Sequence, residues 1–242
     1  MGRVTKLGSR SDPDVAATAA LVGDRSRAAM LMALADGRAL PASELAHYAH
    51  VSPQTASSHL DRLFKGNLIA VEIQGRHHYY RIRDDRVAQL IERLAVIAPP
   101  APAITPAQRR GAQKLRFART CYGHLAGALG VAVSQALCDR GMLVEGVDAY
   151  RVTDRGKEWF RRIDVDVDAL RCSMKRPLTR WCIDWSERRR HLSGVLGVAM
   201  TQRFFALSWI VRVRQSRAVR MTERGRAAFV SELGLANEAE RP

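Results

Sequence analysis

Short polar side chains are concentrated in residues 53–65, where apolar residues recur at helical spacing. Ala56, Leu60 and Leu63 fall on one face of the expected helix. The other face carries Gln54, Thr55, Ser57, Ser58, His59 and Arg62. Small donors and acceptors of this kind let a helix approach the base edges and phosphates of a DNA major groove. An ordinary solvated helix face is the alternative.

A basic and aromatic segment at 74–81 has the composition of a hairpin tip. Gly75 provides the conformational freedom that a tight turn requires. The candidate DNA contacts here are Arg76, His77, His78 and Arg81, whose side chains can reach phosphates or the minor groove. Adjacent histidines on a strand point to opposite faces, so we do not expect these two to share a metal ion. A solvated tip is again the alternative.

Two Cys/His pairs provide a different chemistry further along the chain. Cys121 lies three residues before His124, and Cys182 lies nine residues before His191. Two thiolates and two imidazoles would complete a tetrahedral zinc site. The spacing of the second pair is unusual for such a site, and structural packing or capping explains the histidines equally well. Buried structural cysteines are the default expectation.

Aromatic residues near the second pair suggest a small-molecule pocket. The candidate lining is Trp159, Trp181, Cys182 and Trp185, with the nearby polar group Asp184. Aromatic walls with few polar groups suit organic ligands. The alternative is the aromatic core of a compact domain.

The elements that position the first two groups are predicted by capping signals and periodicity. Asp12-Pro13 is expected to begin a helix over 12–22. Asp24 is expected to begin a second helix, which ends at Gly37. A short helix over 42–49 and a helix over 53–65, begun by Ser52-Pro53 and ended by Gly66, form a helix-turn-helix. Strands over 68–73 and 77–82 form a hairpin, and a helix over 84–98 follows.

A proline-rich segment divides the chain. Four prolines lie within residues 99–106 and favour an extended linker over 99–107. The predicted domains are 1–98 and 108–242. Residues 124–135 match residues 191–202 at eight of twelve positions, which indicates an internal duplication over about 119–165 and 180–235. Each copy is expected to run helix, two strands, helix, resembling the 53–98 segment. A plain helical bundle is the alternative. The predicted fold class is mainly α with small β-hairpins.

Residues 12–98 resemble the ArsR/SmtB family of bacterial winged-helix regulators. The similarity rests on the sequence motifs at residues 24–27, 42–46, 51–60 and 75–82. It implies a cytoplasmic, homodimeric, double-stranded-DNA-binding transcription factor that is usually a ligand-released repressor. It also implies dimer contacts through 12–22 and 84–98. The family's metal sites do not carry over, because Pro41-Ala42-Ser43 lacks a cysteine pair and Asp85-Arg86-Val87 lacks a histidine.

Composition and charge narrow the classes of function that remain. The 242 residues carry a formal charge of +15, which favours a polyanionic partner. Residues 1–98 contribute +3 and residues 99–242 contribute +12. No enzyme motif, membrane span or secretory signal is expected, and no cofactor is required, although a metal or small-molecule effector is possible. The open alternatives are an effector-free architectural DNA-binding protein and a ligand-binding or enzymatic protein with an N-terminal adaptor.

Overall fold

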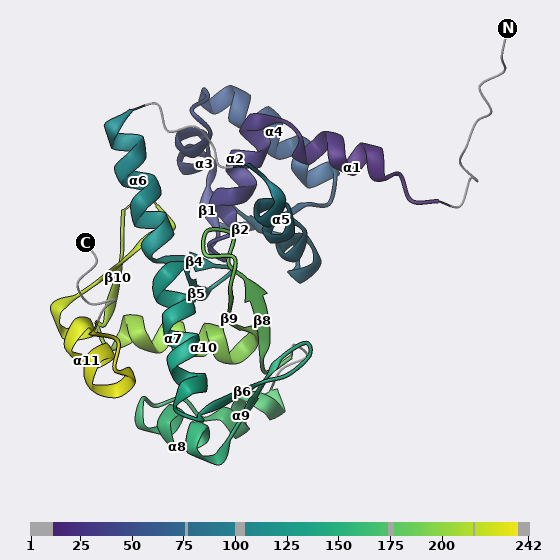
Figure 1. The fold of residues 1–242 in the computed structure, drawn as a ribbon. Coiled ribbons are helices and arrows are strands. Elements are labelled where there is room, and N and C mark those ends of the chain that lie inside the picture. Colours follow the sequence, from purple (N-terminus) through teal and green to yellow (C-terminus); the bar gives the residue numbers. More distant parts are fainter. Residues whose placement is uncertain (1–11, 76, 100–104, 174–176, 215, 237–242) are drawn as a thin grey trace, which may run out of the picture.

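The winged-helix domain is built from short elements in a fixed order. The computed structural model describes residues 12–75, 77–99, 105–173, 177–214 and 216–236. Its first half comprises α1 (Val15–Val22), α2 (Arg25–Leu34), β1 (Leu40–Pro41), α3 (Ala42–Ala49), α4 (Pro53–Lys65), β2 (Ile69–Gln74), β3 (His77–Ile82) and α5 (Asp85–Ile97) (Figure 1). The antiparallel sheet has the order β1-β3-β2. The prediction of a winged helix-turn-helix is confirmed.

Capping side chains define most of these helices as the sequence predicts. Asp24 accepts from Arg27 N, Ser52 accepts from Thr55 N, and Asp84 accepts from two backbone N–H groups. At α1 the cap is Asp14 rather than the expected Asp12, and the helix begins at Val15. Strand β1 was not predicted, because two residues ending in proline give no periodic signal.

The C-terminal half begins with α6 (Pro106–Phe117) and then repeats one unit twice. The first copy is β4 (Arg119–Cys121), β5 (His124–Ala126), α7 (Gly127–Asp139), β6 (Leu143–Glu145), β7 (Tyr150–Val152) and α8 (Asp154–Arg162). After α9 (Val167–Ser173), the second copy is β8 (Arg180–Ile183), β9 (Arg190–Ser193), α10 (Gly194–Ala206), β10 (Ile210–Arg212), β11 (Val219–Met221) and α11 (Glu223–Leu233).

Three features of this half correct the sequence predictions. The hairpin that precedes the first helix of each copy, with His124 and His191 in its strands, was not predicted. Helix α6 already begins at Pro106, inside the expected linker, and linker residues 100–104 lie outside the described residues. Helices α6 and α9 were not predicted. Each copy otherwise follows the predicted order of helix, two strands and helix.

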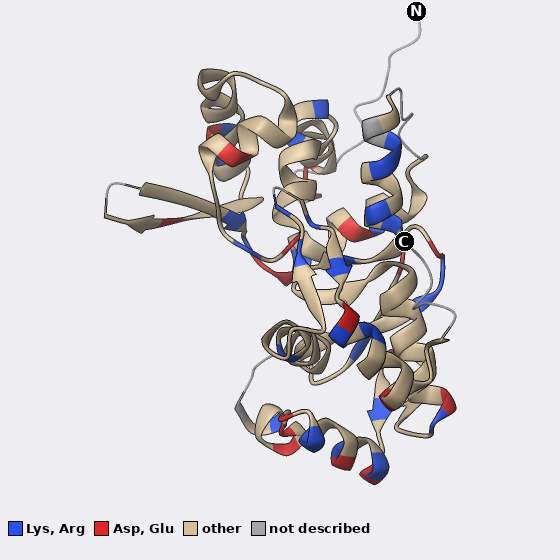
Figure 2. Cartoon of the chain, turned by 90° about the vertical axis from the view of Figure 1, so that its left-hand side faces the viewer, with Lys and Arg blue, Asp and Glu red and all other residues tan. Residues whose placement is uncertain are grey.

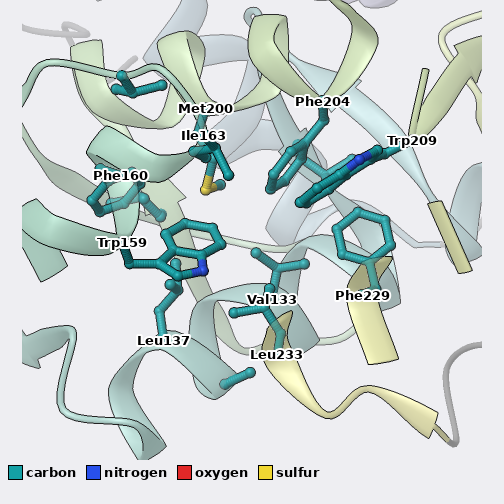
Figure 3. Packing of buried hydrophobic residues seen from close by; sticks show 14 of the residues in the cluster. Val133, Leu137, Trp159, Phe160, Ile163, Met200, Phe204, Trp209, Phe229 and Leu233 are labelled. Atoms are coloured by element: carbon teal, nitrogen blue, oxygen red, sulfur yellow. The ribbon is translucent and has the colours of Figure 1, made fainter. Parts of the chain in front are cut away.

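Each half has its own apolar core. The C-terminal core contains fully buried aromatic side chains from both copies (Figure 3). Phe204 stacks on Trp209 with ring centroids 5.1 Å apart, and Phe229 meets both rings edge-on. Trp159 packs edge-on against Phe160 at 5.1 Å. Because the two copies share one core, the C-terminal half forms a single unit.

The two halves contact each other through the β4–β5 hairpin, which lies between them in Figure 1. Tyr122 N, at the hairpin turn, donates to Ala35 O at 2.7 Å. The buried carboxylate of Asp36 accepts from Thr120 and pairs with Arg212 at 3.1 Å. These contacts connect the end of α2 to the first hairpin of the C-terminal half and to β10 of its second copy. Among the described residues, no helix has the length and apolar character needed to cross a membrane.

Candidate DNA-binding surface and Cys/His cluster

The second helix of the helix-turn-helix presents its polar face to solvent. Ala56, Leu60 and Leu63 are fully buried against the rest of the domain. The predicted base contacts on the other face are exposed: Gln54, Thr55, Ser57, Ser58 and Arg62. His50 takes the left-handed conformation, with φ of 53°, at the end of α3. The sharp turn that follows leaves the N-terminal end of α4 free to approach a groove.

His59 has a different environment from its neighbours on α4. Its side chain is half-buried, with Nδ1 3.4 Å from an Arg27 guanidinium nitrogen and 3.8 Å from an Asp24 carboxylate oxygen. Arg27 itself donates to Leu21 O and Ala20 O. The N–H of Arg27 is the main reason that the pKa of Asp24 lies below its ordinary value. His59 therefore connects α4 to the start of α2.

The hairpin β2–β3 projects from the sheet and carries the remaining predicted contacts. His77 and His78 are exposed near its end, and Gly75 adopts a φ of +59° in the turn. Arg76 lies outside the described residues. Arg81 pairs with Glu72 and also donates to Ile82 O and Arg83 O. The guanidinium of Arg81 is thus held by its own hairpin, while both histidines are unobstructed.

A sequence relative identifies the family to which this arrangement belongs. The chain is 41% identical over 224 residues to an uncharacterized HTH-type transcriptional regulator, YdfF, of Bacillus subtilis (strain 168). The match covers 93% of this chain and 99% of the relative. The chain belongs to the HTH-type transcriptional regulators. It is a DNA-binding transcriptional regulator, and its N-terminal domain has the winged helix-turn-helix that the motifs predict.

Comparison with solved structures and family models adds little to this assignment. NolR of Sinorhizobium fredii is 23% identical, with 36% of this chain and 85% of that chain covered and a TM-score of 0.33. The winged helix-turn-helix domain Mb0332 of Mycobacterium bovis is 27% identical, with 38% and 89% covered and a TM-score of 0.33. The cadmium sensor CmtR of Mycobacterium tuberculosis is 25% identical, with 38% and 95% covered and a TM-score of 0.31. No family model matches the regulator.

The structure brings the two Cys/His pairs of the regulator together. Their four ligand atoms lie within 4.8 Å of one another. The Cys121 and Cys182 Sγ atoms are 4.0 Å apart, and the His124 and His191 Nε2 atoms are 3.0 Å apart. Within each hairpin the two residues face each other across the strands, Cys121 opposite His124 and Cys182 opposite His191. The sequence showed both pairs but not their proximity.

The cluster favours the metal-binding protonation states of Cys182 and His124, whereas it favours the protonated thiol of Cys121. The contact with the Cys121 thiol, reinforced by both imidazoles, holds the pKa of Cys182 well below its usual range despite burial. The same contact and burial raise the pKa of Cys121. Burial lowers the pKa of His124 and keeps this imidazole neutral. A thiolate and a neutral imidazole therefore stand side by side.

A cavity of about 610 Å³ adjoins the cluster. One wall is α5, and the other is formed by the two hairpins, including Trp181, Cys121, His124 and Cys182. Of the predicted aromatic pocket, Trp181 and Cys182 line this cavity, whereas Trp159 is buried in the core and Trp185 packs under Arg119. The four predicted pocket residues therefore do not share one cavity.

Glu92 is a residue of this region that the sequence reasoning missed. The residue is only 7% exposed, and one carboxylate oxygen lies 3.8 Å from Arg217 of the C-terminal half. Its Oε1 atom has no hydrogen-bond partner. A usable signal existed, since Glu92 lies one turn after Ala88 and beside Ile91 on the buried face of α5.

Proposed function

We propose that the regulator is a homodimeric, sequence-specific repressor that reads DNA with α4 and responds to an effector bound by its C-terminal half. The observation that carries the proposal is the polar face of α4, where five of the predicted base contacts are exposed. Side chains of this kind hydrogen-bond to base edges. Binding over a promoter would exclude polymerase from it in the cytoplasm.

The effector half of the proposal is supported by the position of the cavity. It lies between α5 of the DNA-binding domain and the hairpins of the C-terminal half. A ligand held there contacts both halves, so its binding energy can depend on their arrangement. That dependence is the requirement for coupling between two sites.

Base reading is tested by removing two hydroxyls from α4. The variant Ser57→Ala/Ser58→Ala should bind a duplex selected from a random pool about tenfold more weakly, because each neutral hydrogen bond contributes about 0.5–1.5 kcal/mol. Binding to unrelated DNA should change little, since phosphate contacts remain. Fluorescence anisotropy at fixed salt measures both affinities.

The matched control is Ser231→Ala. Ser231 is also exposed on a helix, and its Oγ donates to a backbone carbonyl of its own helix, as that of Ser57 does. This variant should bind DNA like the wild type. An equal loss on selected and unrelated DNA for the α4 variant would overturn the base-reading assignment.

Helix α6 favours a second contribution to DNA binding. It carries four exposed basic side chains and no acidic residue: Arg109, Arg110, Lys114 and Arg116. Figure 2 shows how the basic and acidic residues are distributed along the chain. This group of basic side chains favours the alternative in which the C-terminal half also binds DNA. Exchanging Arg109, Arg110 and Lys114 for Gln should then reduce the slope of log affinity against log salt by up to about 0.9 per lost contact. An unchanged slope would argue against phosphate contacts from α6.

A further inference from the structure

The strongest feature that DNA binding leaves unexplained is the cluster of Cys121, His124, Cys182 and His191. These residues come from two hairpins separated by more than fifty residues of sequence, yet their ligand atoms converge inside the C-terminal half. Three of the four residues are buried, and the fourth, Cys182, is partly buried. Among the described residues, no other group of three or more potential ligands converges in this way.

The duplication places these ligands at equivalent positions of its two copies. Leu125 N donates to Thr201 Oγ1 and Leu192 N donates to Ser134 Oγ, both at 2.8 Å, so each hairpin bonds to the other copy's helix. This reciprocal pair relates equivalent positions of the two copies. His124 and His191 are also equivalent positions, and their rings meet at the same junction. One ion at the junction would therefore receive one Cys and one His from each copy.

The interatomic distances fit a tetrahedral ion of the zinc class. Zn–S bonds of about 2.3 Å and Zn–N bonds of about 2.0–2.1 Å place ligand atoms of an ideal tetrahedron about 3.8 Å apart for sulfur pairs and about 3.3 Å apart for nitrogen pairs. The corresponding distances in the cluster are 4.0 Å and 3.0 Å. These two distances differ from the ideal values by a few tenths of an ångström, and all four ligand atoms lie within 4.8 Å of one another. Both imidazoles present Nε2, which is a common ligand atom of histidine.

We propose that Cys121, His124, Cys182 and His191 bind one zinc-class divalent ion at the junction of the two copies, and that this ion sets the position of the β4–β5 hairpin against the DNA-binding domain. Two thiolates and two imidazoles form a donor set typical of closed, four-coordinate zinc sites. The cavity beside Cys121, His124 and Cys182 provides a route for the ion.

The route from the ion to the DNA-binding domain is short. Tyr122 lies in the turn between two of the ligands, and its N–H donates to Ala35 O at the end of α2. Gly37 of the α2–β1 loop lies so close to this turn that an added Cβ would approach Gly123 N to 2.9 Å. Fixing Cys121 and His124 on an ion fixes the turn that both contacts use. This regulatory part rests on the proposed function, whereas ion binding does not.

The test of the ion site uses Co²⁺ as a spectroscopic probe on the reduced, chelator-treated full chain. We expect one equivalent to produce the strong visible bands of tetrahedral Co²⁺ and a thiolate charge-transfer band, both abolished by one equivalent of Zn²⁺. Cys182→Ser and His191→Gln should weaken binding by at least a hundredfold. The control Cys138→Ser/Cys172→Ser, which removes the two cysteines outside the cluster, should bind like the wild type.

Two outcomes overturn the ion site. One is a reduced wild-type protein that gives no tetrahedral spectrum, a result that does not depend on whether the variants fold. The other is a Cys121–Cys182 disulfide found by mass spectrometry of the air-exposed protein, together with no ion uptake after reduction. The pair would then be a redox pair. Circular dichroism of each variant separates loss of ligands from loss of fold.

The regulatory part is tested by DNA affinity with and without one equivalent of Zn²⁺, on a duplex selected by the protein. We expect a change of about 5–150-fold, the usual range of allosteric coupling, in the wild type and in Cys138→Ser/Cys172→Ser but not in Cys182→Ser. A wild type that binds Zn²⁺ with unchanged DNA affinity overturns this part. A protein that binds no DNA under either condition overturns the proposed function, while the Co²⁺ spectrum still reports the ion site.

Discussion

Replacing Arg119 by Met is expected to lower the free energy of unfolding by about 3–5 kcal/mol, because removing one partner of a buried ion pair leaves the other charge uncompensated. Arg119 is 1% exposed and Asp184 is fully buried. Their closest nitrogen and oxygen atoms are 2.8 Å apart. The pair joins the first hairpin of one copy to the hairpin loop of the other, so its loss affects the junction of the two copies.

The surroundings of the Arg119–Asp184 pair prevent a local rearrangement that would reduce this loss of stability. The Arg119 guanidinium lies 4.2 Å from the ring centre of Trp185 and also donates to Leu115 O. The Asp184 carboxylate accepts from Gly127 N at 2.6 Å and from Ser186 N at 2.9 Å. A carboxylate held by this many donors cannot turn toward water when Arg119 is lost. The double variant Arg119→Met/Asp184→Asn should recover part of the stability, since no buried charge remains.

Urea unfolding followed by tryptophan fluorescence measures this effect in the correct half of the chain, because all four tryptophans follow residue 158. The control is Arg162→Met, which removes an exposed guanidinium that lies 3.1 Å from Glu232. Exposed pairs contribute about 0–1 kcal/mol, so the control should unfold almost like the wild type. An Arg119→Met variant as stable as the control would contradict the prediction.

The Arg119–Asp184 ion pair should also determine how steeply the free energy of unfolding falls at acidic pH. Burial alone would raise the pKa of Asp184, but Arg119, His191 and the hydrogen bonds from Ser186 and Gly127 outweigh it and hold the pKa below its ordinary value. A lowered pKa stabilises the fold above the pKa of an unfolded aspartate, about 3.9, and the contribution is lost as pH falls through the folded pKa. In Arg119→Met, the free energy of unfolding should therefore depend less steeply on pH in the acidic range.

The winged-helix domain could be predicted because its signals are local. Ser52-Pro53 and Gly66 set the ends of α4 within the chain's own neighbourhood, and the alternating apolar residues of 68–82 need no partner to be recognised. The start of α1 was misplaced, Asp14 for Asp12, because both aspartates satisfy the same capping pattern. The choice between them depends on where α1 meets α2, which periodicity does not encode.

The residues of the candidate sites could be named from the sequence, and the two Cys/His pairs could be put forward as one site, but the strands that bring them together could not be predicted. The three-residue strands β4 and β5 are too short for an alternating pattern, so the hairpin that carries Cys121 and His124 gave no strand signal. Asp184 joins Arg119 across 65 residues of sequence, a separation at which spacing carries no information. The duplication was visible in the sequence, yet the reciprocal bonds between its copies were not, because they depend on tertiary packing.

Helix α1 leads to the second large prediction. It has the sequence VAATAALV without a charged residue, it contains no buried residue, and Val15 is 71% exposed. In Figure 1 it extends from the rest of the winged-helix domain. An exposed apolar helix of eight residues gains little stability from its own hydrogen bonds, so a partner that covers it is expected. A second copy of the regulator would pair the two reading helices for neighbouring half-sites.

Val15→Glu/Ala19→Glu is therefore expected to separate the dimer and to weaken binding to the selected duplex by about 10²–10⁴-fold, because the half-sites are then bound independently. The two positions lie one turn apart on one face, and glutamate near a helix N-terminus favours the helix. Sedimentation equilibrium measures the association, and anisotropy measures the DNA affinity. Gln202→Glu, which changes charge at an exposed site on α10, should alter neither.

Charge reversal distinguishes a lost interface from a lost fold. The variant Val15→Lys/Ala19→Lys should also be monomeric, since like charges again meet across the two-fold axis. An equimolar mixture of the glutamate and lysine variants should form heterodimers, because opposite charges then face each other. The mixture should recover most of the DNA affinity that each variant lacks alone. If the wild type is monomeric at concentrations that saturate the duplex, or if mixing restores nothing, the dimer is not built on α1.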